Sequence, residues 1–257
     1  MRILLIRHGD PDYIHDTLTE KGRREAALLA EAAPSLKLGR CFVSPLGRAR
    51  DTAAYSLNKL SLTAQTCDWL QEFPAHIDLN KTPSMKIAYN DTKRNGDQYL
   101  PRILWDMLPS YWTEHPEYTD PVRWKTSDAA KNSDLLSVYD YVTKSLDKLL
   151  AEYGYIREGS HYRVIRESEE TLTFFCHFGI TAALLSHLWS TSPFLLWHSL
   201  ALAPTSVTEL VTEEREQGIA YFRGLRLGDI SHLYAGQEPP SFAARFCETY
   251  SNTSQRH

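Results

Sequence analysis

The chain has 257 residues, of which 42% are hydrophobic and 23% charged, so it can bury a sizeable core and has the composition of a globular protein. Its formal net charge of −4 argues against a general surface for nucleic acid or an anionic membrane, so an anion would have to bind in a local pocket. No run is long and apolar enough to cross a bilayer or to serve as a secretion signal. We therefore expect one cytoplasmic domain over residues 1–257.

The first strand is expected at residues 3–6, where four consecutive apolar residues are typical of a buried parallel strand. Arg7, His8 and Gly9 come next, at its carboxyl end, where open α/β sheets bind their ligands. His8 could act as a nucleophile, Arg7 could hold an oxyanion by paired hydrogen bonds, and Gly9 would let a substrate approach the backbone. These residues suit a phosphate site, although a strand-end histidine bonded to the backbone beside a solvated arginine is the ordinary alternative.

The next segments repeat this order of strand, loop and helix. A helix capped by Thr17 or Thr19 is expected first, then a short strand at 41–43 and a second helix at about 48–59. Arg48 would lie in the first turn of that second helix, where free backbone N–H groups and the helix dipole favour an anion. An arginine at a helix start is more often merely solvated, but a nearby second arginine makes this one a candidate phosphate ligand.

A carboxylate comes after the third strand, which is expected within residues 62–70. Glu72 lies there beside Phe73 and Pro74, and apolar surroundings can raise the pKa of a carboxyl so that it serves as a proton donor. Most glutamates in such loops face water instead.

The regular alternation fails over residues 76–132, which we interpret as an insertion. Aromatic residues are frequent in it: Tyr89, Tyr99, Trp105, Tyr111, Trp112, Tyr118 and Trp124. Basic residues are interleaved with them: Lys86, Lys93, Arg94, Arg102, Arg123 and Lys125. The segment could fold over the crevice as a lid that shapes the substrate pocket. Its aromatic residues could equally pack the insertion onto the sheet, or form the subunit interface of a homodimer.

A second strand-end histidine occurs late in the chain. Ser133 is expected to cap an amphipathic helix, and strands are expected at 162–165 and 171–176. The second of these ends at His177, before a helix expected at 180–189. His177 could therefore face the first histidine across the sheet edge and bind the same phosphate, although such a histidine on its own is more often structural.

Residues 207–211 and 220–226 are expected to pair as a hairpin around a charged turn and to close the sheet. The tail from Gln237 onward carries no chemistry that the sequence reveals. The cysteines lack CxxC spacing and the histidines form no HxxxH pair, so we expect buried free thiols and no bound metal. The cysteines are Cys41, Cys67, Cys176 and Cys247.

Taken together and in this order, four features resemble the histidine phosphatase superfamily, whose fold is shared with the cofactor-dependent phosphoglycerate mutases. They are Arg7-His8-Gly9, the motif SPLGRARDTA at 44–53, Glu72, and His177 shortly before Gly179. The RHG triplet alone is a weak signal, but together with SPLxRAxxTA and the late histidine it is specific. The resemblance implies a three-layer α/β/α sandwich with a mostly parallel central sheet, and phosphoryl transfer through a phosphohistidine without metal or cofactor.

The resemblance also implies a role for each matching residue. His8 would be the nucleophile, and the transferring phosphoryl oxygens would be held by Arg7, Arg48 and His177. Glu72 would protonate the leaving alkoxide and later activate water. Two guanidiniums and an imidazole can stabilise charge on phosphoryl oxygens without a metal. His8 must be neutral to attack, with its other ring nitrogen donating to a backbone carbonyl.

The loop after RHG departs from the mutases. They usually carry a serine or threonine and then an asparagine there, whereas this chain has Asp10, Pro11 and Tyr13. The paired arginines and proline run that bind phosphoglycerate in mutases are also missing from 76–132. Mutase specificity is therefore not favoured.

The proton donor also separates this chain from the acid-phosphatase branch, in which an aspartate directly succeeds the second histidine. Phe178 stands at that position, which leaves Glu72 as the better donor and Glu114 as a second candidate. We expect a phosphomonoester hydrolase acting on a small organic phosphate. A phosphoglycerate mutase-type phosphotransferase and a non-catalytic phosphate-binding or scaffold protein are the alternatives.

Overall fold

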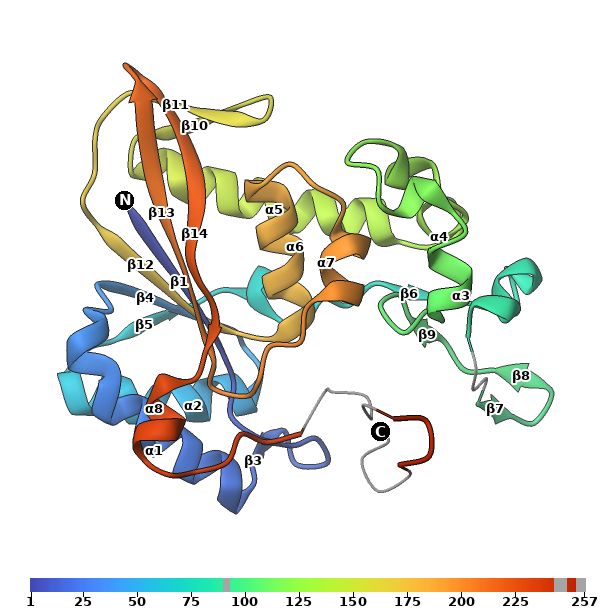
Figure 1. Cartoon of the computed structure of the whole chain (residues 1–257), viewed down its shortest axis with the longest axis horizontal. Helices are drawn as coiled ribbons and strands as arrows, with labels where there is room; N and C mark the ends of the chain where they lie inside the picture. Colours follow the sequence, from blue (N-terminus) through green and yellow to red (C-terminus); the bar gives the residue numbers. More distant parts are fainter. Residues whose placement is uncertain (90–92, 243–248, 253–257) are drawn as a thin grey trace.

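The strand predicted at the start of the chain is β1 (Arg2–Arg7), and it lies in the interior of an eight-stranded sheet (Figure 1). The computed structural model describes residues 1–89, 93–242 and 249–252. Within this described part, the other strands run from one edge of the sheet to β1 in the order β10 (Tyr155–Glu158), β11 (His161–Val164), β14 (Ile219–Asp229) and β13 (Val207–Glu216). Beyond β1 come β12 (Thr171–Cys176), β4 (Arg40–Val43) and β5 (Ala64–Thr66).

The strands beside the predicted site are parallel. β1 pairs with β12, β12 with β4, and β4 with β5, all in the same direction. On the other side of β1 the pairings are antiparallel, so that β13 and β11 run against the other strands of the sheet. Because β1, β12 and β4 end at the same edge of the sheet, the residues after them in the chain meet there.

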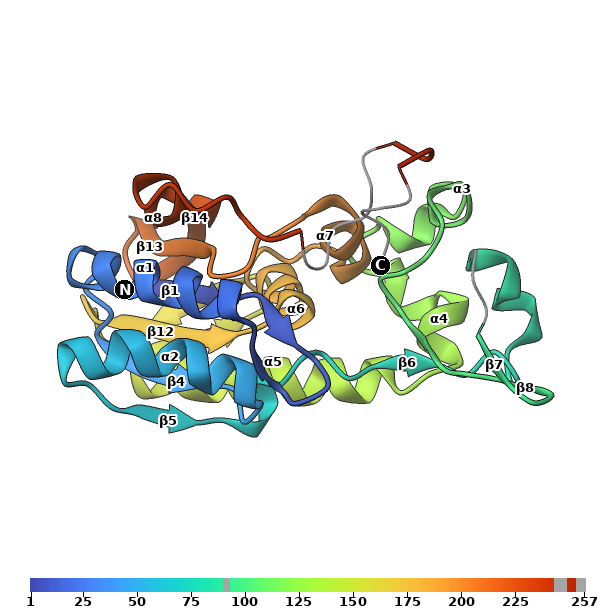
Figure 2. The ribbon, with the colours of Figure 1, turned by 90° about the horizontal axis from the view of Figure 1, so that it is seen from below.

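Helices cover both faces of the sheet, which gives three layers (Figure 2). Alternate side chains of β1 face opposite ways: Leu4 and Ile6 pack in one apolar cluster and Ile3 and Leu5 in the other. The first cluster is covered by α1 (Glu20–Leu36) and α2 (Gly47–Leu60), the second by α5 (Leu135–Glu152) and α6 (Phe178–Leu188).

The first two helices lie close to where the sequence predicts them. Thr19 caps α1, because its hydroxyl oxygen accepts a hydrogen bond from the Gly22 N–H at 3.0 Å. Ser133, by contrast, is not the cap of α5. The N-cap residue is Asp134, whose side chain makes no capping hydrogen bond. The Ser133 hydroxyl instead accepts a hydrogen bond from the N–H of Leu135, the first residue of α5.

The hairpin prediction is correct in its pairing but wrong in its position. β13 and β14 pair through most of the segment that was expected to be a charged turn, and they lie inside the sheet. β11 pairs with β14, and β10, for which no strand was predicted, forms the edge. The hairpin therefore does not close the sheet, because further strands add to its free side.

Residues 76–132 form short elements beyond α6 and to the right of the sheet in Figure 1. They are β6 (His76–Ile77), η2 (Pro83–Ala88), β7 (Arg94–Asn95), β8 (Gln98–Tyr99), β9 (Arg102–Ile103), α3 (Pro109–Trp112), η3 (Pro116–Tyr118), η4 (Arg123–Thr126) and α4 (Asp128–Lys131). Four of the segment's aromatic residues are buried in the main core, as the packing alternative expected: Tyr89, Tyr111, Tyr118 and Trp124.

The remaining elements are β2 (Pro11–Asp12), β3 (Thr17–Leu18), η1 (Asp68–Leu70), α7 (Pro193–Ser199) and α8 (Ser231–Ala235). No helix in the described ranges is long and apolar enough to cross a membrane. Cys41, Cys67 and Cys176 are buried free thiols, as expected, and Cys247 lies outside the described residues.

Candidate active site

The two predicted histidines lie side by side at the carboxyl edge of the parallel strands. His8 comes directly after β1, and His177 lies between β12 and α6, so neighbouring strands deliver them. Their ring centroids are 5.0 Å apart, and the rings are tilted by 58°. Both side chains are buried, with 1% and 0% of their surface exposed. The backbone bond from the His8 N–H to the Cys176 carbonyl, 3.0 Å long, ties the two strand ends together.

His8 has the environment of a neutral imidazole. Its Nδ1 lies 2.7 Å from the Gly9 carbonyl oxygen, which can only accept, so Nδ1 carries the proton and Nε2 has the lone pair. Burial holds the pKa of His8 well below its usual range, and the nearby Arg7 charge lowers it further. A neutral ring with a defined tautomer is the form that can attack phosphorus.

One ring nitrogen of His177 has a hydrogen-bond partner among the described residues, and the other has none. Its Nε2 lies 2.7 Å from the Ser44 hydroxyl, while its Nδ1 is buried and finds no hydrogen-bond partner among the described residues. Burial and then the charges of Arg48 and Arg7 keep its pKa well below the usual range. A buried ring nitrogen without a partner is costly unless a ligand supplies one.

Two buried guanidiniums complete the cationic side of the site. Arg7 is 2% exposed and donates to the Leu202 carbonyl oxygen. Arg48, in the first turn of α2, pairs through Nη1 with the Asp16 carboxylate at 2.6 Å, while its Nε has no partner in the described part of the chain. Asp16 also accepts from the Gly47 N–H, so an anion does lie at the start of α2, but it is the protein's own carboxylate.

Glu72 reaches the same edge from a different element than expected. The strand β5 is only three residues long and η1 comes next, so Glu72 lies after a 3-10 turn and not at a strand end. Its Oε1 accepts from the Phe73 N–H at 3.0 Å and from the Ile180 N–H at 3.2 Å, which anchors it to α6. Burial raises the pKa of the Glu72 carboxyl. Glu114, the other candidate donor, is exposed between α3 and η3.

Sequence reasoning assigned no role to several residues that position the site. Ser44 opened the quoted motif, so its presence was noted but its partner was not. Asp16 lies in a loop, and nothing in the sequence around it predicts an ion pair with Arg48, 32 residues away. The Thr52 hydroxyl accepts from the Gly9 N–H at 2.9 Å, and the Tyr13 ring lies 5.4 Å from the Arg48 guanidinium carbon. All four contacts are made between elements, which a sequence pattern does not record.

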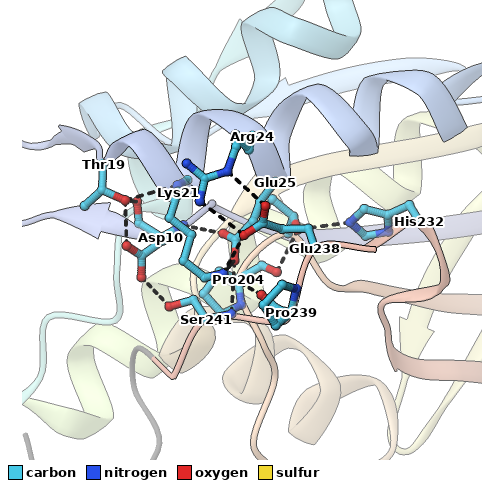
Figure 3. A network of polar contacts seen from close by, with 12 residues as sticks. Asp10, Thr19, Lys21, Arg24, Glu25, Pro204, His232, Glu238, Pro239 and Ser241 are labelled. Atoms are coloured by element: carbon cyan, nitrogen blue, oxygen red, sulfur yellow. Dashed lines mark hydrogen bonds and ion pairs between the residues drawn. The ribbon is translucent and has the colours of Figure 1, made fainter. Parts of the chain in front are cut away.

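The tail also supports the site, although its sequence gave no indication of a role (Figure 3). Ser241 donates from its hydroxyl to the carboxylate of Asp10, the residue after Gly9, and from its N–H to Glu25 at 3.1 Å. The Glu25 carboxylate also accepts from the Asp10 N–H at 2.8 Å. Glu25 thereby joins the loop after His8, the helix α1 and the tail.

Ion pairs at the surface of α1 hold the same tail segment. Glu238 pairs with Lys21 at 2.7 Å and with Arg24 at 2.9 Å (Figure 3). Nearby, His232 of α8 contacts the Thr205 hydroxyl at 3.0 Å, and the Thr205 N–H donates to the His8 carbonyl at 3.1 Å. The carboxyl-terminal elements are thus linked to the backbone of the predicted nucleophile.

Residues 3–96 match the family profile described as "Histidine phosphatase superfamily (branch 1)". The resemblance to this superfamily is confirmed. The matched stretch includes Arg7, His8, Arg48 and Glu72, whereas His177 lies beyond it and is brought to the site by the fold. The family match also agrees with the prediction that the chain is an enzyme of the histidine phosphatase type.

Solved structures share the fold of this chain. A phosphoserine phosphatase mutant from Entamoeba histolytica is 14% identical with a TM-score of 0.56, and the match covers 90% of this chain and 98% of that one. A mycobacterial glucosyl-3-phosphoglycerate phosphatase is 18% identical with a TM-score of 0.55, covering 88% and 98%. YhfR of Bacillus stearothermophilus is also 18% identical, with a TM-score of 0.55 and coverage of 90% and 98%. No curated protein matches the chain. At these identities the likeness establishes the fold, and the predicted α/β architecture is confirmed.

Proposed function

We propose that this chain is a metal-independent phosphomonoester hydrolase that acts on a small organic phosphate through a phosphohistidine intermediate. The observation that carries the proposal is the pair of buried imidazoles, 5.0 Å apart, close to two buried guanidiniums. Burying two imidazoles beside two guanidiniums is costly, because each group loses hydration and the like charges repel. A phosphoryl group would add negative charge at this point and an acceptor for Nδ1 of His177, which has no partner among the described residues.

In the first step, Nε2 of His8 attacks phosphorus and forms the P–N bond as the P–O bond to the leaving group breaks. The leaving oxygen takes its proton from Glu72, whose raised pKa favours the protonated form that can donate. In the second step, Glu72 takes a proton from water, and the resulting hydroxide nucleophile displaces His8 from phosphorus. Inorganic phosphate is then released, and the neutral His8 side chain is regenerated.

The remaining residues stabilise the transferring phosphoryl oxygens. Arg7 and Arg48 place positive charge next to them in a site from which water is largely excluded. His177 can add a hydrogen bond only if its Nδ1 carries a proton. That tautomer requires Ser44 to donate to Nε2, which the 2.7 Å contact permits. Ser44 is therefore a positioning residue for His177 in this mechanism.

We further propose that residues 1–257 act as one domain in which 76–132 forms the cover of the site. The support is continuity of the core: the buried aromatic residues of this segment belong to the same apolar cluster as β1 and α6. A cover packed in this way is a fixed wall of the pocket, and it limits the space for the organic part of a substrate.

The test is hydrolysis of phenyl phosphate in EDTA by wild type, by His8→Ala and by His161→Ala, a control at a histidine on the edge-side strand β11. Wild type and the control should be active and the His8 variant should be inactive. Rapid quenching with substrate labelled in the phosphoryl group should trap label on wild type and the control but not on the His8 variant. A fully active His8→Ala protein would falsify the proposal. Interconversion of phosphoglycerates that depends on a bisphosphorylated primer would favour the mutase instead, and phosphate binding without label would favour a binding protein.

A further inference from the structure

One side chain of the covering segment reaches the catalytic residues. Trp105 lies just after β9, and its ring meets Glu72 across Gly179 in the first turn of α6. A Cβ atom on Gly179 would lie 2.6 Å from Cη2 of Trp105 and 2.7 Å from Oε1 of Glu72. The indole and the carboxylate therefore converge on the same point, and a larger residue than glycine would collide with both.

The indole is fixed in this position by its neighbours. Trp105 packs edge-on against Phe178, with centroids 6.4 Å apart, and at 45° against Trp197, with centroids 5.8 Å apart. Trp197 in turn donates from its indole N–H to the Gly179 carbonyl at 2.9 Å. Leu104, the residue before it, and Met107, two residues after it, are buried in the core. Trp105 is thus a rigid aromatic wall beside the proposed proton donor.

Three basic residues of the same segment contact other side chains of that segment. Lys86 and Arg94 lie on the Tyr99 ring, each 4.3 Å from its centroid, and the β7–β8 hairpin is at the far side of the molecule (Figure 1). Arg102 lies 3.6 Å from the Asp106 carboxylate. The side chain of this segment that meets Glu72 at Gly179 is thus aromatic, whereas the cations Arg7 and Arg48 are already assigned to the phosphoryl group.

We infer that Trp105 determines substrate specificity, because a ring on the leaving group packs against its indole while the ester oxygen faces Glu72. The preferred substrates are phosphomonoesters of ring alcohols, either aryl or sugar, over open-chain esters. A flat or C–H-rich ring face suits an aromatic wall, whereas an open chain presents no such face to the indole. The inference rests on the proposed function, since it uses Glu72 as the donor to the leaving group.

The test compares kcat/KM of wild type and Trp105→Ala on phenyl phosphate, glucose 1-phosphate and ethyl phosphate. For each ester we take the ratio of kcat/KM of wild type to that of the variant, so that the intrinsic reactivity of the ester cancels. We expect a ratio of roughly tenfold for at least one ring ester, the size of one stacking contact, and below about twofold for ethyl phosphate. A loss on phenyl phosphate alone assigns an aryl group, and a loss on glucose 1-phosphate alone assigns a sugar. Trp112→Ala, at a tryptophan of the same segment that contacts His198, is the matched control and should show no such difference.

Trp105→Leu and Trp105→Phe are measured in the same way. They keep the test valid if the Ala variant fails to fold. The Phe variant should recover part of the ring preference and the Leu variant should not. Equal ratios for all three esters in folded variants would overturn the inference and leave the proposed function standing. A wild-type protein without His8-dependent hydrolysis of any ester would instead overturn both.

Discussion

Replacing Glu25 by glutamine should change the pH dependence of stability, because this carboxyl is completely buried between α1, the loop after His8 and the tail. Burial raises the pKa of Glu25 to about 7, although the N–H groups of Asp10 and Ser241 and the charge of Lys21 all favour the ionised form. The cost of removing the carboxylate from water therefore exceeds the gain from its donors.

The direction of the effect is set by proton binding. In the unfolded chain the carboxyl has its ordinary pKa of 4.5, so between pH 4.5 and 7 the folded protein binds a proton that the unfolded chain has lost. Stability from this group is therefore fully present at low pH and falls as pH rises to about 7. A shift of this size corresponds to about 3 kcal/mol at 1.36 kcal/mol per pKa unit.

The assay is urea unfolding of wild type and Glu25→Gln at pH values from 5 to 8. The variant cannot ionise at this position, so its free energy of unfolding relative to wild type should rise by about 2.5 kcal/mol across this range, the remainder of the effect lying below pH 5. Glu20→Gln, at an exposed position in the first turn of α1, is the control and should show little pH-dependent difference. A constant difference for Glu25→Gln would show that the donors cancel the effect of burial, and one that falls with pH would show that they outweigh it; either result would refute the reasoning.

Three other outcomes are expected. Ser44→Ala removes the hydroxyl that contacts the His177 ring, so kcat/KM should fall roughly tenfold, and the unfolding temperature should fall as well because Nε2 of His177 loses its partner in a buried site; unchanged kinetics would contradict the proposed tautomer. Glu72→Gln should lower kcat/KM, which reports the step that cleaves the P–O bond, by about 10²-fold or more for ethyl phosphate but much less for 4-nitrophenyl phosphate, because that leaving group needs no proton; equal losses in kcat/KM would exclude Glu72 as the donor. Phe174→Ala empties a fully buried position stacked on Phe42 at 5.2 Å, so the free energy of unfolding in urea should fall by about 3–5 kcal/mol, and a cost below about 1 kcal/mol would mean that the core refills the cavity.

The amino-acid sequence by itself determined the strand–loop–helix units that carry the site. An apolar run that ends in a reactive residue specifies both a buried strand and the side chain at its carboxyl end, as for β1 with His8 and for β12 with His177. Thr19 was identifiable as a candidate cap because capping depends on residues a few positions apart. Such features are local, and local physics decides them.

Only the tertiary structure decided which partners these residues have. The place of the β13–β14 hairpin depends on β11, a strand from much earlier in the chain, pairing with its free edge. The partners of Arg48 and His177 are Asp16 and Ser44, which lie on other loops. The approach of Trp105 to Gly179 depends on the packing of the whole covering segment. Contacts of this kind are set by how the layers stack, because burial is collective and leaves no fixed spacing along the chain.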